Sequence, residues 1–429
     1  MIWVKSGTAA YGKVLAAAAG RGVAESEKVS AVVAEVIARV RREGDAALAD
    51  YTRRFDGFDP GRKGFAVPKR EIEAAFRRTP ARLKGSLAFA AARIEAFHAH
   101  QAETGFSAGL PGAVLGQRIL PVVRAGVYVP GGKAAYPSTL LMNAIPARVA
   151  GVREVIAACA APRGAVPDVV LAAARIAGVS AVYRIGGAQA VAALAFGTRS
   201  VPPVDVIAGP GNAYVTEAKR QVFGRVGIDM LAGPSELVVL ADATARPAYV
   251  AADLLSQAEH DEDAFVALVT DSASLSRMVA AELGRQAKTL PRKGILAGAL
   301  ARAVGFLVKD LDEGIEVVNR IAPEHLGIVV ENPWAALERI RNAGTAFLGP
   351  YSPVAVGDYV AGINHTLPTG GAARFSSPLG VATFLKRTNV VSYEFRALSA
   401  DAAHVVRLAE KEGLVAHARA VRIRTGGEA

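Results

Sequence analysis

The chain has 429 residues, of which 52% are hydrophobic and 21% charged, and its formal net charge is +11. This composition is too apolar for a disordered protein, and the length suffices for two or three domains around sizeable cores. The charge would suit a nucleic-acid-binding protein, but Lys and Arg are scattered along the sequence, and no RNA-binding aromatic motif or Cys/His finger spacing occurs. We therefore expect a globular protein with a solvated, Arg-rich surface and no nucleic-acid partner.

The cysteine content and the N-terminal sequence indicate the cellular compartment. The only cysteine, Cys159, lies in an apolar run at 155–160 that predicts a buried strand, where a thiol acts as a small hydrophobic group. A single cysteine forms no disulfide within the chain, so no oxidising compartment is required. The first residues lack an apolar segment of signal-peptide length, and no uncharged run is long enough to span a bilayer. We expect a cytoplasmic protein without a membrane partner.

In chain order, the first predicted region is helical. Between about residues 25 and 100 apolar residues such as Val29, Val33 and Val36 recur at helical spacing. From about residue 122, short β-branched runs that end in Gly or Pro alternate with Ala-rich helical runs. The predicted strands are 122–129, 154–158, 181–185, 204–208, 237–240, 265–270, 326–330 and 345–348. Strands that alternate with helices are typical of parallel α/β sheets.

The domain organisation follows from these runs. Residues 208–212 and 348–352 each close an apolar strand with a Gly-Pro turn, which suggests duplicated halves. The predicted fold class is α/β, with two Rossmann-like parallel-sheet domains of duplication origin, a helical N-terminal segment and a small C-terminal tail domain of one strand and a charged helix. The predicted domains are an N-terminal segment (1–25), a discontinuous first α/β domain (26–125 and 237–380), a second α/β domain (126–236) and a C-terminal tail (381–429).

Three segments could carry chemistry. Gln257 and His260 stand at i and i+3 at the end of a helix that Pro247 is predicted to start. This spacing suits two ligands of one metal. Alternatively, His260 only interacts favourably with the dipole at the carboxyl end of the helix. Glu324 and His325 are adjacent at what the pattern predicts as a βα-type junction, and a carboxylate beside an imidazole can supply two general bases, although an ordinary surface turn fits equally. Asp358 lies in a Gly-bounded loop with His365 and could complete a metal site.

Other polar and glycine-rich segments are less specific. Glu412 and His417 stand five residues apart in the C-terminal helix, where solvated helix charge is the simpler interpretation. The glycines at 126–133 and 186–190 follow or open elements at strand ends, but neither run has the full P-loop or dinucleotide-binding spacing. Helix N-termini that follow strands nevertheless favour dinucleotide binding.

Seven short motifs, in order and spacing, resemble the histidinol dehydrogenase family along nearly the whole chain. They are GVYVPGG at 126–132, GGAQA at 186–190, AGPGN at 208–212, AGPSE at 232–236, QAEH at 257–260, PEHL at 323–326 and GDY at 357–359. The resemblance implies one zinc ion per subunit, held by Gln257, His260, Asp358 and His417. It implies substrate contacts from those four residues and from Ser235, His325 and Glu412, and NAD contacts from Tyr128, Gln189 and Asn212.

The resemblance also implies a reaction: oxidation of L-histidinol through its aldehyde to L-histidine, with two hydrides passing to two NAD molecules. His325 is expected to take the alcohol proton, and Glu324 to activate the water that adds to the aldehyde. The family is a homodimer with shared active sites, so Glu412 and His417 would come from the partner. One alternative is a related zinc and NAD dehydrogenase that acts on another polyol or a sulfonated diol; the negative charge of Glu412 disfavours the sulfonated substrate. The other alternative is a basic nucleic-acid-binding protein without enzymatic activity.

Overall fold

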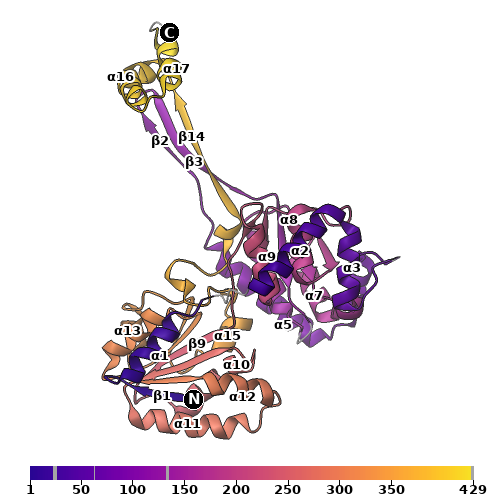
Figure 1. Ribbon diagram of the computed structural model, residues 1–429, viewed down its shortest axis with the longest axis vertical. Coiled ribbons are helices and arrows are strands. Elements are labelled where there is room, and N and C mark those ends of the chain that lie inside the picture. The colour runs from indigo at the N-terminus through magenta and orange to yellow at the C-terminus, as the bar shows by residue number, and fades with distance from the viewer. Residues whose placement is uncertain (23–26, 62, 132–134, 427–429) are drawn as a thin grey trace. The chain divides into compact units, whose positions relative to one another are not determined.

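The computed structural model describes residues 1–22, 27–61, 63–131 and 135–426 (Figure 1). The chain divides into two compact units. The first comprises Met1–Gln101 and Val123–Phe384, and the second comprises Ala102–Val122 and Leu385–Ala429. Lys133 and Gly132, from the first glycine-rich run, lie outside the described residues.

The first unit contains a six-stranded parallel sheet. Its strands, in spatial order, are β1 (Ile2–Lys5), β11 (Val304–Leu307), β10 (Phe265–Thr270), β9 (Glu236–Ala241), β12 (His325–Val329) and β13 (Thr345–Leu348). One face is covered by α1 (Ala9–Ala19), α13 (Leu311–Ile321) and α14 (Pro333–Leu337), and the other by α10 (Pro247–Ala258), α11 (Ala273–Ala287), α12 (Lys293–Arg302) and α15 (Val354–Tyr359) (Figure 1). Because both faces are covered, Val238 and Val239 enter different cores, and β9 is apolar from Leu237 to Ala241.

The same unit contains a five-stranded parallel sheet. Its order is β6 (Ala181–Arg184), β5 (Glu154–Cys159), β4 (Arg124–Val129), β7 (Val206–Ala208) and β8 (Gly227–Ile228). Its helices are α2 (Glu27–Glu43), α3 (Asp45–Asp56), α8 (Gly187–Phe196) and α9 (Ala213–Val222) in one core, and α6 (Pro137–Val149) and α7 (Asp168–Ala177), against which α5 (Ala81–Ala99) and α4 (Lys69–Arg78) pack. The strand order reverses between β4 and β7, which makes a topological switch point.

Local sequence signals explain where several helices begin and end. Pro247 occupies the first turn of α10, as predicted, where its missing N–H costs no hydrogen bond. Asn212 caps α9, and Ser272 and Asp310 cap α11 and α13, each through a side-chain oxygen that accepts from the first turn. Gly178 ends α7 in the left-handed conformation. Three single-turn 3-10 helices, η1 (Pro162–Gly164), η2 (Ala372–Arg374) and η3 (Val381–Phe384), lie in connections.

The predicted fold class is confirmed, and each of the eight predicted strands corresponds to a strand of the two parallel sheets. The grouping of residues 26–125 with 237–380 is corrected by the packing of the N-terminal helices. Val33, Val36 and Leu48 from α2 and α3 join the core of the five-stranded sheet. An amphipathic stripe shows that a helix is covered on one side, but not by which sheet, so the sequence pattern could not choose between the two cores.

The second unit is an antiparallel sheet with two helices. Strand β3 (Ala113–Pro121) pairs with β14 (Leu385–Tyr393) on one side and β2 (Phe106–Leu110) on the other, and the chain then forms α16 (Phe395–Lys411) and α17 (Val415–Thr425). One strand and one helix were predicted after residue 381. The strands β2 and β3 were not predicted, because their residues are largely exposed and include glycines at 109 and 116.

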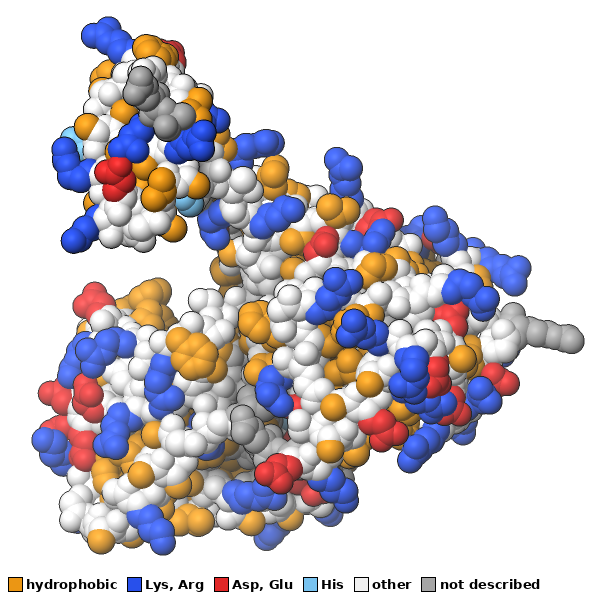
Figure 2. Space-filling view, turned by 45° about the horizontal axis from the view of Figure 1, so that its top comes forward, with side chains coloured by type: hydrophobic (Ala, Val, Ile, Leu, Met, Phe, Trp, Pro, Cys, Tyr) orange, Lys and Arg blue, Asp and Glu red, His pale blue; other side chains and the backbone are white. Residues whose placement is uncertain are grey.

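Figure 2 shows Lys and Arg side chains interspersed with Asp and Glu side chains over the visible face, in keeping with the scattered basic residues of the sequence. In the part of the chain that the structure describes, no helix is long and apolar enough to cross a membrane. Cys159 is a buried free thiol in β5, and burial raises its pKa to about 12, as expected for a structural cysteine.

Candidate active site

The predicted catalytic pair lies at the amino ends of β9 and β12. His325 is the first residue of β12 and stands opposite Leu237 of β9, so that Glu324 and Glu236 lie beside each other just before this pair. The pair therefore follows α13 at the start of a strand, and its predicted placement at a βα-type junction is wrong. α13 ends at Ile321, and the capping residue Ala322 adopts a left-handed φ of 50°; β12 begins three residues later.

The contacts of His325 fix which ring nitrogen is basic. Its Nδ1 lies 2.9 Å from the backbone oxygen of Glu236, which can only accept, so Nδ1 carries the proton. In the neutral ring Nε2 is then the free base. Nε2 is buried, forms no hydrogen bond with any described residue, and lies 3.8 Å from Oδ1 of Asp358. A buried basic nitrogen without a partner is the expected state of a group that awaits a substrate proton.

Electrostatics around His325 favour its charged form. Burial lowers its pKa, but the adjacent Glu324 carboxylate, Asp358 and the Glu236 backbone oxygen together outweigh burial and raise the pKa to about 9. Glu324 is itself buried and held in place: its Oε2 accepts a 2.7 Å hydrogen bond from the Glu236 backbone N–H and lies 3.4 Å from Nδ1 of His325. The acid and the imidazole thus form one fixed pair.

Three predicted metal ligands belong to the same edge of the six-stranded sheet. Gln257 is buried in the last turn of α10, His260 follows that helix and is exposed, and Asp358 lies in α15. In this neighbourhood burial lowers the pKa of His365, Asp358 opposes the effect, and the His325 and His260 rings lower it further. His365 thus stands among these groups. In the sequence His365 shares a Gly-bounded segment with Asp358, and no motif assigns it a role.

The remaining predicted site residues are distributed over both units. Ser235 precedes β9 and is half-buried, whereas Glu412 caps the end of α16 and His417 lies in the first turn of α17, both exposed in the second unit. Over residues 1–22, 27–61, 63–131 and 135–426, no group of three or more His, Cys, Asp or Glu side chains is close enough to hold a metal ion. The first unit contributes only two such predicted ligands, His260 and Asp358, with the Gln257 amide.

The donor chemistry of these residues still fits zinc. An imidazole nitrogen, a carboxylate oxygen and an amide oxygen are all ligands that a catalytic zinc ion accepts, and such a site keeps room for substrate atoms. The unpartnered Nε2 of His325 lies beside Asp358, so a proton acceptor stands next to the proposed ligands. His417 and Glu412 remain predictions.

The predicted cofactor residues lie at the carboxyl edge of the five-stranded sheet. Tyr128, near the end of β4, is buried, which raises its pKa to about 12, and its hydroxyl accepts a 3.0 Å hydrogen bond from the backbone N–H of Gly187 at the start of α8. Gln189 is buried in the first turn of that helix. The Asn212 side chain accepts from the N–H groups of Tyr214 and Val215, each at 3.1 Å, and so acts as the cap of α9.

Backbone geometry brings these turns close together. Gly209 follows β7 with a φ of 116°, and a Cβ at this position would lie 2.3 Å from the Tyr128 backbone oxygen, so only glycine fits. Tyr128 and Gly209 flank the point where the strand order reverses, which is where open α/β sheets bind ligands. A cavity of about 240 Å³ adjoins this edge and is lined by Val129, Pro130 and Cys159, among others.

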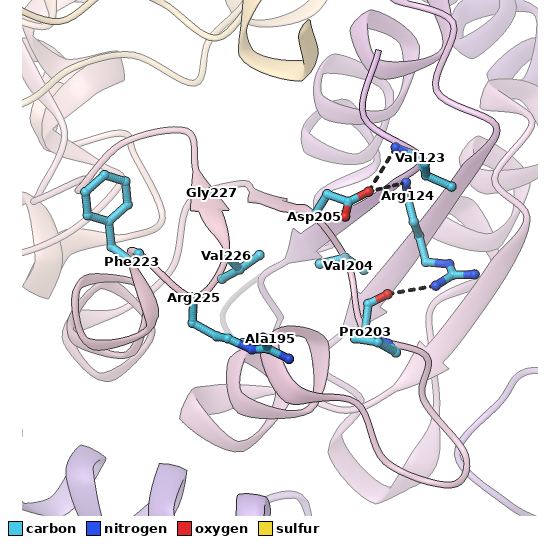
Figure 3. Close-up of a pocket in the computed structure, with 11 residues that line it drawn as sticks. Val123, Arg124, Ala195, Pro203, Val204, Asp205, Phe223, Arg225, Val226 and Gly227 are labelled. Carbon is cyan, nitrogen blue, oxygen red and sulfur yellow. Dashed lines mark hydrogen bonds between the residues drawn. The ribbon is translucent and has the colours of Figure 1, made fainter. Parts of the chain in front are cut away.

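Another cavity, of about 490 Å³, lies at the opposite, amino edge of the same sheet (Figure 3). Its lining includes Arg124, Asp205 and Phe223, and Oδ2 of Asp205 accepts hydrogen bonds of 2.9 Å from the backbone N–H groups of Val123 and Arg124. These hydrogen bonds connect the segment before β7 to the start of β4. None of the predicted site residues lines this cavity, so cavity size does not locate the site.

Two parallel sheets, glycine-rich turns at a topological switch and a buried acid–imidazole pair define an α/β enzyme equipped for general base catalysis. The histidinol dehydrogenase family model matches residues 20–425. The chain is 50% identical to a histidinol dehydrogenase of Syntrophotalea carbinolica over 416 residues, 96% of both chains, and 51% identical to that of Moorella thermoacetica over 402 residues, 93% of this chain and 95% of the relative. A crystal structure of histidinol dehydrogenase from Elizabethkingia anophelis is similar with a TM-score of 0.93 and 36% identity, over 99% of this chain and 98% of the other.

The chain therefore belongs to the histidinol dehydrogenase family. It is accordingly an oxidoreductase, and the resemblance inferred from seven short motifs is confirmed.

Proposed function

We propose that this protein catalyses the zinc-dependent, four-electron oxidation of L-histidinol through L-histidinaldehyde to L-histidine, with reduction of two NAD. One observation carries the proposal: a buried Glu324–His325 pair whose Nδ1 is committed to the Glu236 backbone, which leaves Nε2 as a basic nitrogen without a partner. Membership of the family supports the choice of substrate.

In the first oxidation, Nε2 of His325 takes the hydroxyl proton of the alcohol as the carbon–hydrogen bond breaks and a hydride leaves. NAD, when bound near Tyr128, Gln189 and Asn212, is the acceptor of that hydride and of the second one. The carbon is then an aldehyde, which has no further hydroxyl proton to lose. Water must add before another hydride can leave.

Glu324 is suited to that addition. Its carboxylate takes one proton from water while the water oxygen bonds to the aldehyde carbon, and the protonated His325 returns its proton to the carbonyl oxygen, giving a hydrate. Glu324 then releases its proton to solvent. His325, once it has released its first proton, takes a hydroxyl proton of the hydrate as the second hydride leaves, and the product is a carboxylic acid. The adjacency of the two side chains lets one fixed substrate carbon meet both bases.

Zinc, when bound by Gln257, His260, Asp358 and His417 of the partner subunit, would orient the substrate and retain the aldehyde between the two oxidations. Ser235 and the partner subunit's Glu412 are proposed as further substrate contacts. The site would thus be completed in a homodimer.

Zinc content tests the ligand assignment. We expect His260→Asn to lower bound zinc well below one ion per chain, because a mixed oxygen and nitrogen site loses its imidazole from the first unit. His404→Asn is the matched control, since His404 is an exposed histidine of α16 outside the proposed ligand set. Equal zinc content in the two variants, measured by elemental analysis after dialysis, would remove His260 from the site.

Substrate profiling distinguishes the proposal from its nearest alternative, a zinc and NAD dehydrogenase for another polyol or a sulfonated diol. With zinc and NAD present, we expect turnover of L-histidinol and none of sulfonated diols, because a sulfonate would meet the negative charge of Glu412. Turnover of a sulfonated diol or polyol without turnover of histidinol would establish the alternative.

A further inference from the structure

Glu236, the first residue of β9, holds both bases of the proposed mechanism through its backbone. Its N–H donates to Oε2 of Glu324 at 2.7 Å, and its carbonyl oxygen accepts from Nδ1 of His325 at 2.9 Å. The tautomer of His325 and the orientation of Glu324 therefore depend on where this one peptide lies.

The Glu236 side chain fixes that position in turn. It is only 4% exposed, and its oxygens accept from the backbone N–H of Gly370 at 2.9 Å and of Glu324 at 3.4 Å. Two buried carboxylates, Glu236 and Glu324, thus lie side by side at the start of adjacent strands. An uncompensated pair of this kind would be pushed apart or would bind a proton, because like charges repel strongly away from water.

Arg21 supplies the compensating charge. Its Nε donates to Oε1 of Glu236 at 3.1 Å. Its Nη2 lies 3.0 Å from Oε2 and adds a charge contact, although it forms no hydrogen bond with any described residue. The guanidinium also lies 3.6 Å from the ring centroid of Phe265 and donates to the backbone oxygen of Ala18 at the end of α1. It is 19% exposed, and it forms the one ion pair of Glu236 within the described part of the chain.

We infer that Arg21 is a positioning residue for the Glu324–His325 pair and acts through the Glu236 carboxylate. The inference rests on the proposed function, because it assigns Arg21 to the two bases named there. Arg21 is about 215 residues away from Glu236 in the chain and touches neither base directly. It fixes the start of β9, where the Glu236 backbone forms hydrogen bonds with both Glu324 and His325.

The test uses the full-length protein with zinc and NAD. Arg21→Gln should lower kcat for histidinol by at least about tenfold while KM changes by less than about twofold, since a small displacement of a catalytic group costs rate more than binding. Arg21→Lys should restore part of kcat, because it keeps the charge but not the two-nitrogen geometry. Combining Arg21→Gln with Glu236→Gln should cost less than the product of the two single losses, since both break one interaction.

Arg124→Gln is the matched control for a purely structural effect. Arg124 is also a partly buried arginine, paired with Glu154 and bonded to the Pro203 backbone oxygen at 2.8 Å, at the far edge of the other sheet (Figure 3). Both variants should lower the thermal midpoint, but only Arg21→Gln should lower kcat. Equal kcat in Arg21→Gln and wild type, or equal losses in the two variants, would overturn the inference.

A second readout needs no substrate. In imidazole ¹H–¹⁵N spectra, assigned with His325→Asn, wild-type His325 should show an Nδ1–H signal, which the neutral and the charged ring both carry when Nδ1 donates to the Glu236 backbone oxygen. Arg21→Gln should lose or broaden that signal, whereas Arg124→Gln should keep it. An unchanged His325 signal in Arg21→Gln would refute the positioning role. Failure of the wild type to oxidise histidinol would refute the proposed function alone, because this spectrum would still decide the role of Arg21.

Discussion

Asp253 lies on α10, one turn before Gln257, and we expect its replacement to stabilise the protein in a pH-dependent way. Burial raises the pKa of this carboxyl from an ordinary value of 3.8 to about 6. Between pH 3.8 and about pH 6, Asp253 is therefore mostly protonated in the folded protein and mostly ionised in the unfolded chain. As pH rises through this range the charged form must be buried, so the free energy of unfolding falls.

The size of the effect follows from the two pKa values. A difference of about 2 corresponds to about 3 kcal/mol, and about 2 kcal/mol remains after allowing for partial solvent exposure of the group. In Asp253→Asn this pH-dependent cost is absent. Relative to wild type, the variant should gain about 2 kcal/mol between pH 4 and pH 8, with most of the gain complete by pH 7. Urea unfolding at each pH measures the difference, and a constant difference across the range would refute the reasoning.

Two further predictions concern buried charges. Lys219→Met should destabilise the protein by about 3–5 kcal/mol in urea unfolding, since it leaves the Asp229 carboxylate buried without its cation. Arg285→Met breaks a surface pair and should leave the free energy of unfolding almost unchanged. Similar losses in the two variants would contradict this expectation. The kcat/KM for histidinol should rise with pH and level off above about pH 9, because His325 must lose its proton to act as a base. Glu324→Gln should move this rise to lower pH, because it removes a charge that raises the pKa of His325. An unchanged pH profile would show that another group controls the rise.

Much of the fold could be predicted because parallel strands that are covered on both faces are apolar throughout. β9, β10 and β5 each contain a run of five consecutive hydrophobic residues, at 237–241, 265–269 and 155–159. The strands β2 and β3 give no such signal, because many of their residues are exposed. They pair with each other locally, but β3 also pairs with β14, which lies more than 260 residues away in the chain.

Part of the candidate site, like part of the fold, follows from the sequence, and the rest depends on tertiary packing. Glu324 and His325 are neighbours in sequence, so their proximity follows from the covalent chain alone, and Gln257 and His260 share one helix end. The positions of Glu236 and Arg21 beside the pair depend on the register of β9 against β12 and on the placement of α1. A single arginine just after a helix matches no motif, so nothing in the sequence distinguishes Arg21 from the other arginines.

The most direct test of the central claim is the number of NADH molecules formed per L-histidinol consumed by the purified, zinc-loaded protein. We expect two NADH per histidinol with histidine as the product, loss of this turnover on chelation and recovery with added zinc. One NADH per histidinol, with aldehyde released, would contradict the second oxidation and the role of Glu324. No NADH at all from the folded, zinc-loaded protein would contradict histidinol as the substrate.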